Sequence, residues 1–213
     1  MPMQLVQSFS LDIARGLEFI HSKGYVHNDI KMENVLIVNN PNGRTEGQCK
    51  YMAKICDLGF AQEVVNNDGS IRSYNRGYAT TTYAAPECLV KSRKDARLSD
   101  IWAFGVIVYR MITYHSPFPS FSSEDKKDKI KVKERVDLML SHDIYSGLKN
   151  VGHITAEELS ELEDILKRLL EPEVSKREPM YVLVGDKWFE DRQRSDAYDK
   201  SRGLKSREPL FMF

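Results

Sequence analysis

Residues 25–37 read YVHNDIKMENVLI, and they place one histidine, two acids, one lysine and two asparagines among apolar neighbours. Polar groups that lie next to a hydrophobic core need hydrogen-bond partners, so a chain rarely crowds them together without a use for them. We therefore take this stretch as the candidate for the residues that carry the chemistry, and we ask whether the remaining sequence supports it.

Length and composition limit the class of protein. The chain has 213 residues, which is enough for one domain with a sizeable core, and 41% of them are hydrophobic. Lys plus Arg and Asp plus Glu both number 31, so no net charge attracts nucleic acid or an anionic membrane, and we expect neither as a partner. Three cysteines without paired spacing, and no signal peptide, predict an intracellular, cytoplasmic protein.

Apolar residues spaced three and four positions apart predict most of the structure as helix. The predicted helices cover 4–23, which Gly24 ends, 99–113, 123–140 and 155–170. The helix that opens at Ser99-Asp100 is apolar on nearly every face, so we expect it at the centre of the fold.

Two short runs rich in β-branched and aromatic residues, 34–38 and 50–58, predict strands. Residues 59–86 show no periodicity, and a loop of that length inside a domain is usually functional. The sequence thus predicts a mainly α (α+β) fold over residues 1–190, followed by a charged tail over 191–213.

Five motifs occur in a fixed order along the chain. The stretch HNDIKMEN, from His27, resembles the catalytic loop H-R-D-x-K-x-x-N of eukaryotic-type protein kinases. Asp57-Leu58-Gly59 is similar to the D-F-G motif of that family, and Ala85-Pro86-Glu87 matches A-P-E. DIWAFG, from Asp100, resembles the D-x-W-x-x-G that opens the family's central helix, and Arg177 takes the place of an arginine that pairs with the A-P-E glutamate. The resemblance implies a kinase-like C-terminal lobe whose short β-hairpins carry the catalytic and metal-binding loops.

The resemblance also implies a role for each residue of the site. Asp29 would accept and orient the proton of a substrate hydroxyl, and Lys31 would lie against the transferring phosphate. Asn34 and Asp57 would hold Mg²⁺, which prefers oxygen ligands, and Leu36 would form part of an apolar floor for the adenine of ATP. The implied cofactors are ATP and Mg²⁺, and the implied partner is a protein substrate or a partner kinase.

Five further residues would support the site: His27, Thr80, Glu87, Asp100 and Arg177. The threonine matches one that bonds back to the catalytic aspartate and lysine in the family, and a lysine at that position of the loop is the serine/threonine-kinase form. Taken singly, these residues have plainer readings: a core histidine, a helix N-cap at Asp100, or unrelated surface charges. Their common order favours the kinase interpretation.

The resemblance begins at the large lobe of a kinase. The 213 residues contain no G-x-G, and the only lysine before Asp29 is Lys23, so we expect the small lobe, with its glycine-rich loop and ATP-binding lysine, to be absent. The isolated chain should then bind ATP weakly or not at all, and an apolar surface around Val26, Leu36 and Leu58 should be exposed.

Two hypotheses for the function stay open. The chain is the catalytic lobe of a serine/threonine kinase that needs a small lobe, or it is an inactive truncated kinase that acts as a decoy or scaffold. A helical binding module unrelated to kinases would not explain the order of the motifs.

Two features bear on regulation and substrates. Asn28 replaces the arginine that pairs with a loop phosphate in many kinases, and it lacks the charge of that arginine. We therefore expect little activation by phosphorylation of the 59–86 loop. Residues 77–83 and the lysines of 124–140 are candidate specificity elements, and those lysines form either a docking face or a solvated face.

Overall fold

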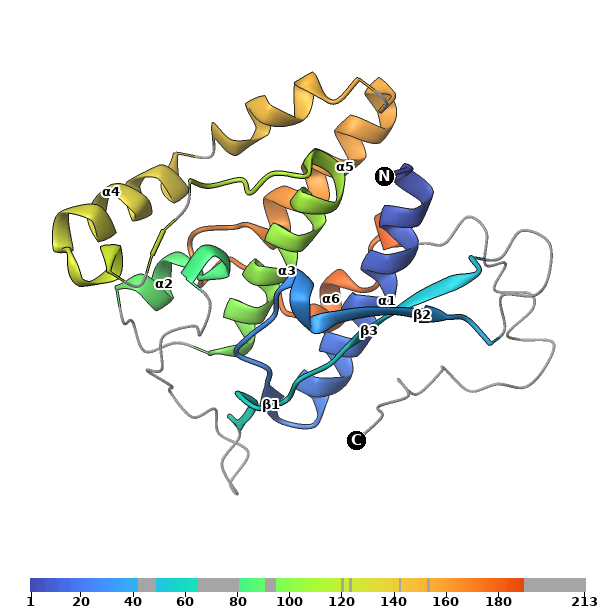
Figure 1. Ribbon diagram of the computed structural model, residues 1–213, viewed down its shortest axis with the longest axis horizontal. Coiled ribbons are helices and arrows are strands. Elements are labelled where there is room, and N and C mark those ends of the chain that lie inside the picture. The colour runs from blue at the N-terminus through green and yellow to red at the C-terminus, as the bar shows by residue number, and fades with distance from the viewer. Residues whose placement is uncertain are drawn as a thin grey trace.

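A central helix, α3, organises the protein, and other helices surround it (Figure 1). The structure is a computed structural model that describes residues 1–41, 49–64, 81–90, 95–119, 121–122, 124–141, 143–152 and 154–189. Helix α3 (Arg97–Thr113) is buried on nearly all sides, as its sequence predicts. It begins two residues before the expected Ser99, because the Asp95 carboxylate accepts hydrogen bonds from the Arg97 backbone and side chain.

Helix α1 (Met3–Ser22) lies against α3 and buries one apolar face that includes Val6, Ile13 and Leu17. The chain leaves this helix through Gly24, whose φ of 80° is in the left-handed region that favours glycine. The amphipathic pattern of the sequence therefore predicted both the helix and its end.

Two short antiparallel pairs of strands carry the loops of the candidate site. Strand β1 (Tyr25–Val26) pairs with β4 (Gln62–Glu63), and β2 (Val35–Asn39) pairs with β3 (Tyr51–Ile55). Strand β3 packs on α1, where the Asp12 carboxylate accepts a hydrogen bond from the Ala53 backbone at 2.9 Å. Strand β1 contacts α1 and α3, so both strand pairs are fixed to the helical body, and β2 and β3 extend beyond it (Figure 1).

The remaining helices complete a mainly helical domain. They are α2 (Pro86–Leu89), α4 (Lys129–Leu140), α5 (Ala156–Leu169) and α6 (Met180–Leu183), with 3₁₀ segments at Met32–Asn34, Thr81–Tyr83, Asp125–Lys127, Asp143–Asn150 and Lys187–Phe189. Thr155 and Glu158 form the capping box that starts α5, within the range of the helix expected over 155–170. The predicted helix over 123–140 is wrong in its first part, because Asp128 caps α4 by accepting hydrogen bonds from the next backbone N–H groups.

Close packing of α3 against α5 depends on a glycine. A Cβ placed on Gly105 would lie 2.8 Å from Leu170 and 2.9 Å from Leu169, so only a glycine lets the two helices come this near. Among the described residues, no helix combines the length and the apolar character needed to cross a bilayer.

Candidate active site

The site is built on the carboxylate of Asp100, which is fully buried in the first turn of α3. Its Oδ2 accepts a hydrogen bond from the His27 backbone at 2.8 Å, and its Oδ1 accepts one from the Asn28 backbone at 3.0 Å. The ring Nε2 of His21 lies 3.0 Å from Oδ2. A buried charge is stable only with such partners, so the first turn of α3 and the loop after β1 hold each other in place.

Asp100 is therefore not the N-cap that the plainer interpretation of the sequence assigned to it. The N-cap of α3 is Ala96, without a side-chain cap, and Asp100 lies within the helix. The carboxylate points to the loop after β1 because that loop offers two backbone N–H donors. The helix has already used its own N–H groups at this end.

The backbone of the loop turns sharply at Asn28, which has a φ of 65°. A positive φ is tolerated by asparagine better than by most residues, and here the amide of the side chain also donates to the Phe60 carbonyl at 3.1 Å. Asn28 is buried, so its side chain joins the loop to the segment after Asp57.

His27 joins the same two segments through its ring. Its Nδ1 accepts a hydrogen bond from the Asp29 backbone at 3.3 Å, and its Nε2 lies 3.1 Å from the Cys56 carbonyl. Because Nδ1 is an acceptor, the proton of the neutral ring is on Nε2, where it is donated to that carbonyl. The predicted support residue His27 is thus fully buried and bonded on both sides.

Three of the predicted residues meet at the end of this loop. The Nζ of Lys31 lies 2.6 Å from Oδ2 of Asp29, and the amide nitrogen of Asn34 donates to the same oxygen at 3.1 Å. Asn34 also donates to the Asp29 backbone carbonyl at 2.8 Å. These bonds fix the orientation of the Asn34 amide and leave its carbonyl oxygen as the atom that can bind a cation.

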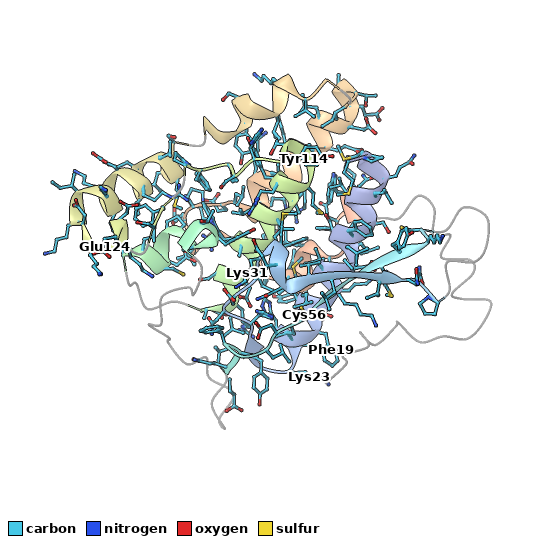
Figure 2. The ribbon with its side chains drawn as sticks, viewed as in Figure 1. Phe19, Lys23, Lys31, Cys56, Tyr114 and Glu124 are labelled. Carbon is cyan, nitrogen blue, oxygen red and sulfur yellow. The ribbon has the colours of Figure 1, made fainter. Side chains whose placement is uncertain are left out.

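Asp57 is brought to the same place by the backbone. The Cys56 N–H donates to the Asn34 carbonyl at 3.0 Å, which continues the β2–β3 pairing directly before Asp57. Asp57 is exposed, has a φ of 64°, and accepts a hydrogen bond from the Gly59 backbone at 3.1 Å. Figure 2 labels Lys31 and Cys56, which mark the two segments that form the site.

The electrostatics agree with this proximity. The hydrogen bond to Asp29 raises the pKa of Lys31 above its ordinary value, against partial burial, and the charges of Asp29, Glu33 and Asp57 raise it further. Lys31 thus carries a positive charge among three carboxylates.

A second buried ion pair supports the site from the other side of α3. Arg177 forms a bidentate pair with Glu87, at 2.7 and 3.1 Å, and donates to the Leu98 carbonyl at 2.8 Å. The Ser99 hydroxyl donates to the same carboxylate at 3.1 Å. Glu87 and Arg177 are both buried, so they are not the unrelated surface charges of the plainer interpretation.

Of the three apolar residues that we expected to be exposed, two are exposed and one is buried. Leu36 is 51% exposed and Leu58 is 44% exposed, whereas Val26 is completely buried. The expectation of an exposed Val26 is therefore wrong, because β1 packs against α1 and α3, which cover this residue. Thr80 and the tail over 191–213 lie outside the described residues.

Sequence reasoning missed Tyr83 and Arg110. The buried hydroxyl of Tyr83 accepts a hydrogen bond from Arg110 of α3, and the Met32 backbone lies 3.4 Å from the same oxygen. Burial raises the pKa of Tyr83, so the hydroxyl stays protonated. The only signal in the sequence is a tyrosine that directly follows three threonines, shortly before Glu87.

The donor set fits a hard divalent cation. Within the described ranges, no three His, Cys, Asp or Glu side chains lie together as a metal site, whereas Asn34 and Asp57 offer an amide and a carboxylate oxygen on two paired segments. Amide and carboxylate oxygens are the ligands that Mg²⁺ prefers, and it commonly completes its shell with water and phosphate oxygens.

The comparison with family models agrees with the geometry. The model of the protein kinase domain matches residues 1–189. The chain therefore belongs to the eukaryotic-type protein kinase family.

Several curated proteins are similar to it. Serine/threonine-protein kinase TOS3 of Saccharomyces cerevisiae strain YJM789 is 29% identical over 92% of this chain and 34% of its own length. Serine/threonine-protein kinase SRK2D of Arabidopsis thaliana is 26% identical over 94% of this chain and 49% of its own. The inhibitor of nuclear factor kappa-B kinase subunit beta of Mus musculus is 30% identical over 70% of this chain and 19% of its own. The chain thus spans less than half of the length of each of these relatives.

The role of Asp100 gives a prediction of stability. Replacing Asp100 with Asn keeps the shape but puts an NH₂ group where an oxygen accepts hydrogen bonds, so one buried donor loses its partner. We expect the free energy of unfolding in urea to fall by about 2–4 kcal/mol. The matched variant Asp137→Asn, on the exposed side of α4, should change it by less than about 0.5 kcal/mol. Equal urea midpoints for Asp100→Asn and the parent would contradict the role given to the carboxylate.

Proposed function

We propose that this chain carries the phosphoryl-transfer machinery of a serine/threonine protein kinase. The observation that supports it most is the contact of Asp29 with both Lys31, at 2.6 Å, and Asn34, at 3.1 Å, beside the Asp57 loop. Phosphoryl transfer needs the two reacting oxygens in line and the phosphate charge neutralised, and this set of side chains has the groups for both tasks.

In this proposal each side chain has one task. Asp29 accepts a hydrogen bond from the hydroxyl of a serine or threonine of the substrate and takes up its proton. Lys31 stabilises negative charge on the transferred phosphate, since its raised pKa keeps it protonated. Asn34 and Asp57 hold the metal ion. When bound, MgATP supplies the phosphoryl group and part of the charge neutralisation.

The proposal includes a small lobe that completes the nucleotide site. Large apolar side chains around the site are half exposed, among them Leu36, Ile37 and Phe60 at 45–51%. Apolar surface of this kind next to a charged site is typical of a face that another domain covers. Each preorganised donor that a catalytic site lacks costs about 10²–10³ in rate. We therefore propose weak or no ATP binding and negligible turnover for these 213 residues alone.

The second hypothesis is a binding protein, an inactive kinase lobe that acts as a decoy or scaffold. It is favoured by the same exposed apolar face and by the lack of a G-x-G in the 213 residues. The two hypotheses differ in whether Asp29 is used, so the experiment has to isolate this residue.

Substitution of Asp29 tests the enzyme hypothesis. The chain joined to a kinase small lobe should transfer radiolabelled phosphate from ATP to a serine peptide, and Asp29→Asn should lower the rate by about 10²–10⁴, the range for loss of a general base. The control Asp164→Asn, on the exposed face of α5, should leave the rate unchanged. Equal transfer by the parent and Asp29→Asn would favour the binding protein. Tight, Mg²⁺-dependent ATP binding by the isolated chain in calorimetry would contradict the need for a small lobe.

The position of Asn28 predicts the response to phosphorylation. Its amide is occupied by the Phe60 carbonyl and carries no positive charge, so it offers no ionic partner to a phosphate on the 59–86 loop. In the joined form, we expect Ser73→Ala and Thr81→Ala to keep the activity of the parent within about twofold, as measured by initial rates after treatment with an activating kinase. A loss of tenfold or more in either variant would show that another residue reads the phosphate.

A further inference from the structure

A groove lies between α2 and α4, away from the site described above. The two helices lie side by side at one end of the protein (Figure 1), and the groove between them has a volume of about 680 Å³. Figure 2 shows Glu124, at the start of the turn that leads into α4, at the far left, whereas Lys31 lies near the middle. None of the residues that line the groove belongs to the site around Asp29.

The floor of the groove is apolar. Leu89 and Val90 come from the end of α2, and Val132 and Val136, one helical turn apart, come from α4. Val90 is 57% exposed although it lies in a concave place where apolar side chains can be covered. A floor of this composition binds aliphatic side chains, because their burial removes apolar area from water.

The rim of the groove is positively charged. It is formed by Lys126, Lys127, Lys129 and Lys133, and the last two lie on the same face of α4 as the valines of the floor. Lys127 is paired with Glu124 at 2.8 Å. In the described part of the chain, Lys126, Lys129 and Lys133 have no carboxylate within ion-pair distance.

The positive rim is a local feature, since the whole chain has a net charge of zero. Lys131, which does not line the groove, is paired with Asp125, and this contact raises the pKa of Lys131. Glu124 thus neutralises one lysine of the rim and Asp125 a lysine outside it, while Lys126, Lys129 and Lys133 remain for a ligand.

We infer that this groove binds an acidic peptide segment of a partner protein, with two aliphatic side chains on the valine and leucine floor and carboxylates at the lysine rim. Charge complementarity selects the partner, and the apolar floor fixes its position. The floor has no aromatic side chain on which a base could stack, which argues against single-stranded nucleic acid. The inference does not rest on the proposed phosphoryl transfer.

Fluorescence anisotropy tests this binding directly. The probe is a fluorescein-labelled peptide, Glu-Asp-Leu-Glu-Glu-Leu-Asp-Glu, titrated with the full chain at low salt. We expect saturable binding in the micromolar range that weakens as salt is added, because exposed charges are screened. Two control peptides separate the contributions: one has Gln and Asn in place of the acids, and the other has Ser in place of both leucines. Both should bind at least about tenfold more weakly.

Variants of the chain locate the site. Lys129→Glu with Lys133→Glu should weaken binding of the acidic peptide by about tenfold or more. The charge-matched pair Lys149→Glu with Lys187→Glu, on exposed positions elsewhere, should change it by less than about twofold. Val90→Ser changes an exposed residue of the floor. It should weaken binding of the probe peptide but not binding of the control peptide that has Ser in place of both leucines.

Three results would overturn the inference. The first is no saturable binding by the parent, and the second is equal binding by the parent and the Lys129→Glu, Lys133→Glu variant. The third is self-association of the parent in sedimentation velocity that this variant abolishes, because the groove would then be an interface between copies of the chain. Since no phosphate transfer is measured, failure here is distinct from failure of the kinase proposal.

Discussion

The buried carboxylate of Asp100 is the interaction on which the rest of the site depends. It lies in the first turn of α3, where the helix dipole favours a negative charge, and it accepts hydrogen bonds from two consecutive backbone N–H groups, those of His27 and Asn28. Two donors held at fixed positions define the path of the loop and the left-handed conformation of Asn28. The next residue is Asp29, so the position of the proposed base follows from a charge in the core.

The start of α3 also holds the segment that contains Glu87. The Leu98 carbonyl accepts from Arg177, and the Ser99 hydroxyl donates to Glu87, directly before Asp100. Three consecutive residues therefore join the loop of the site, the helix after the long loop and the C-terminal part of the domain. Because the ion pair and the carboxylate are buried, loss of either leaves an uncompensated polar group, and neither segment can move without the other.

Much of the fold could be predicted from local patterns. The spacing of Ile13 and Leu17 identified α1, Gly24 marked its end, and the helix expected over 155–170 includes α5. These predictions succeed because caps and periodicity act over a few residues. The proximity of Asp29 to Asn34 and the pairing of Glu87 with Arg177 both followed from the family resemblance.

The remaining features depend on contacts between distant segments. Burial of Val26 results from packing of β1 on α1 and α3, and a strand of two residues gives little sequence signal. Asp100 had the local properties of an N-cap, but its partners lie more than 70 positions earlier in the chain. The hydroxyl of Tyr83 also has a distant partner, since it accepts a hydrogen bond from Arg110 of α3. Local propensity does not contain such information, because tertiary packing decides which of several possible partners a polar group obtains.

The central claim is that the loop held by Asp100 and the loop of Asp57 form one cation site. Titration of the ¹⁵N-labelled chain with Mn²⁺, a paramagnetic ion that accepts the same oxygen ligands as Mg²⁺, tests it most directly. The account predicts that the amide signals of residues 29–34 and 57–59 broaden together and before all others, and that Asp57→Ala removes the effect from both segments. Broadening of the two segments at separate Mn²⁺ concentrations, or first at the acidic face of α5, would contradict it.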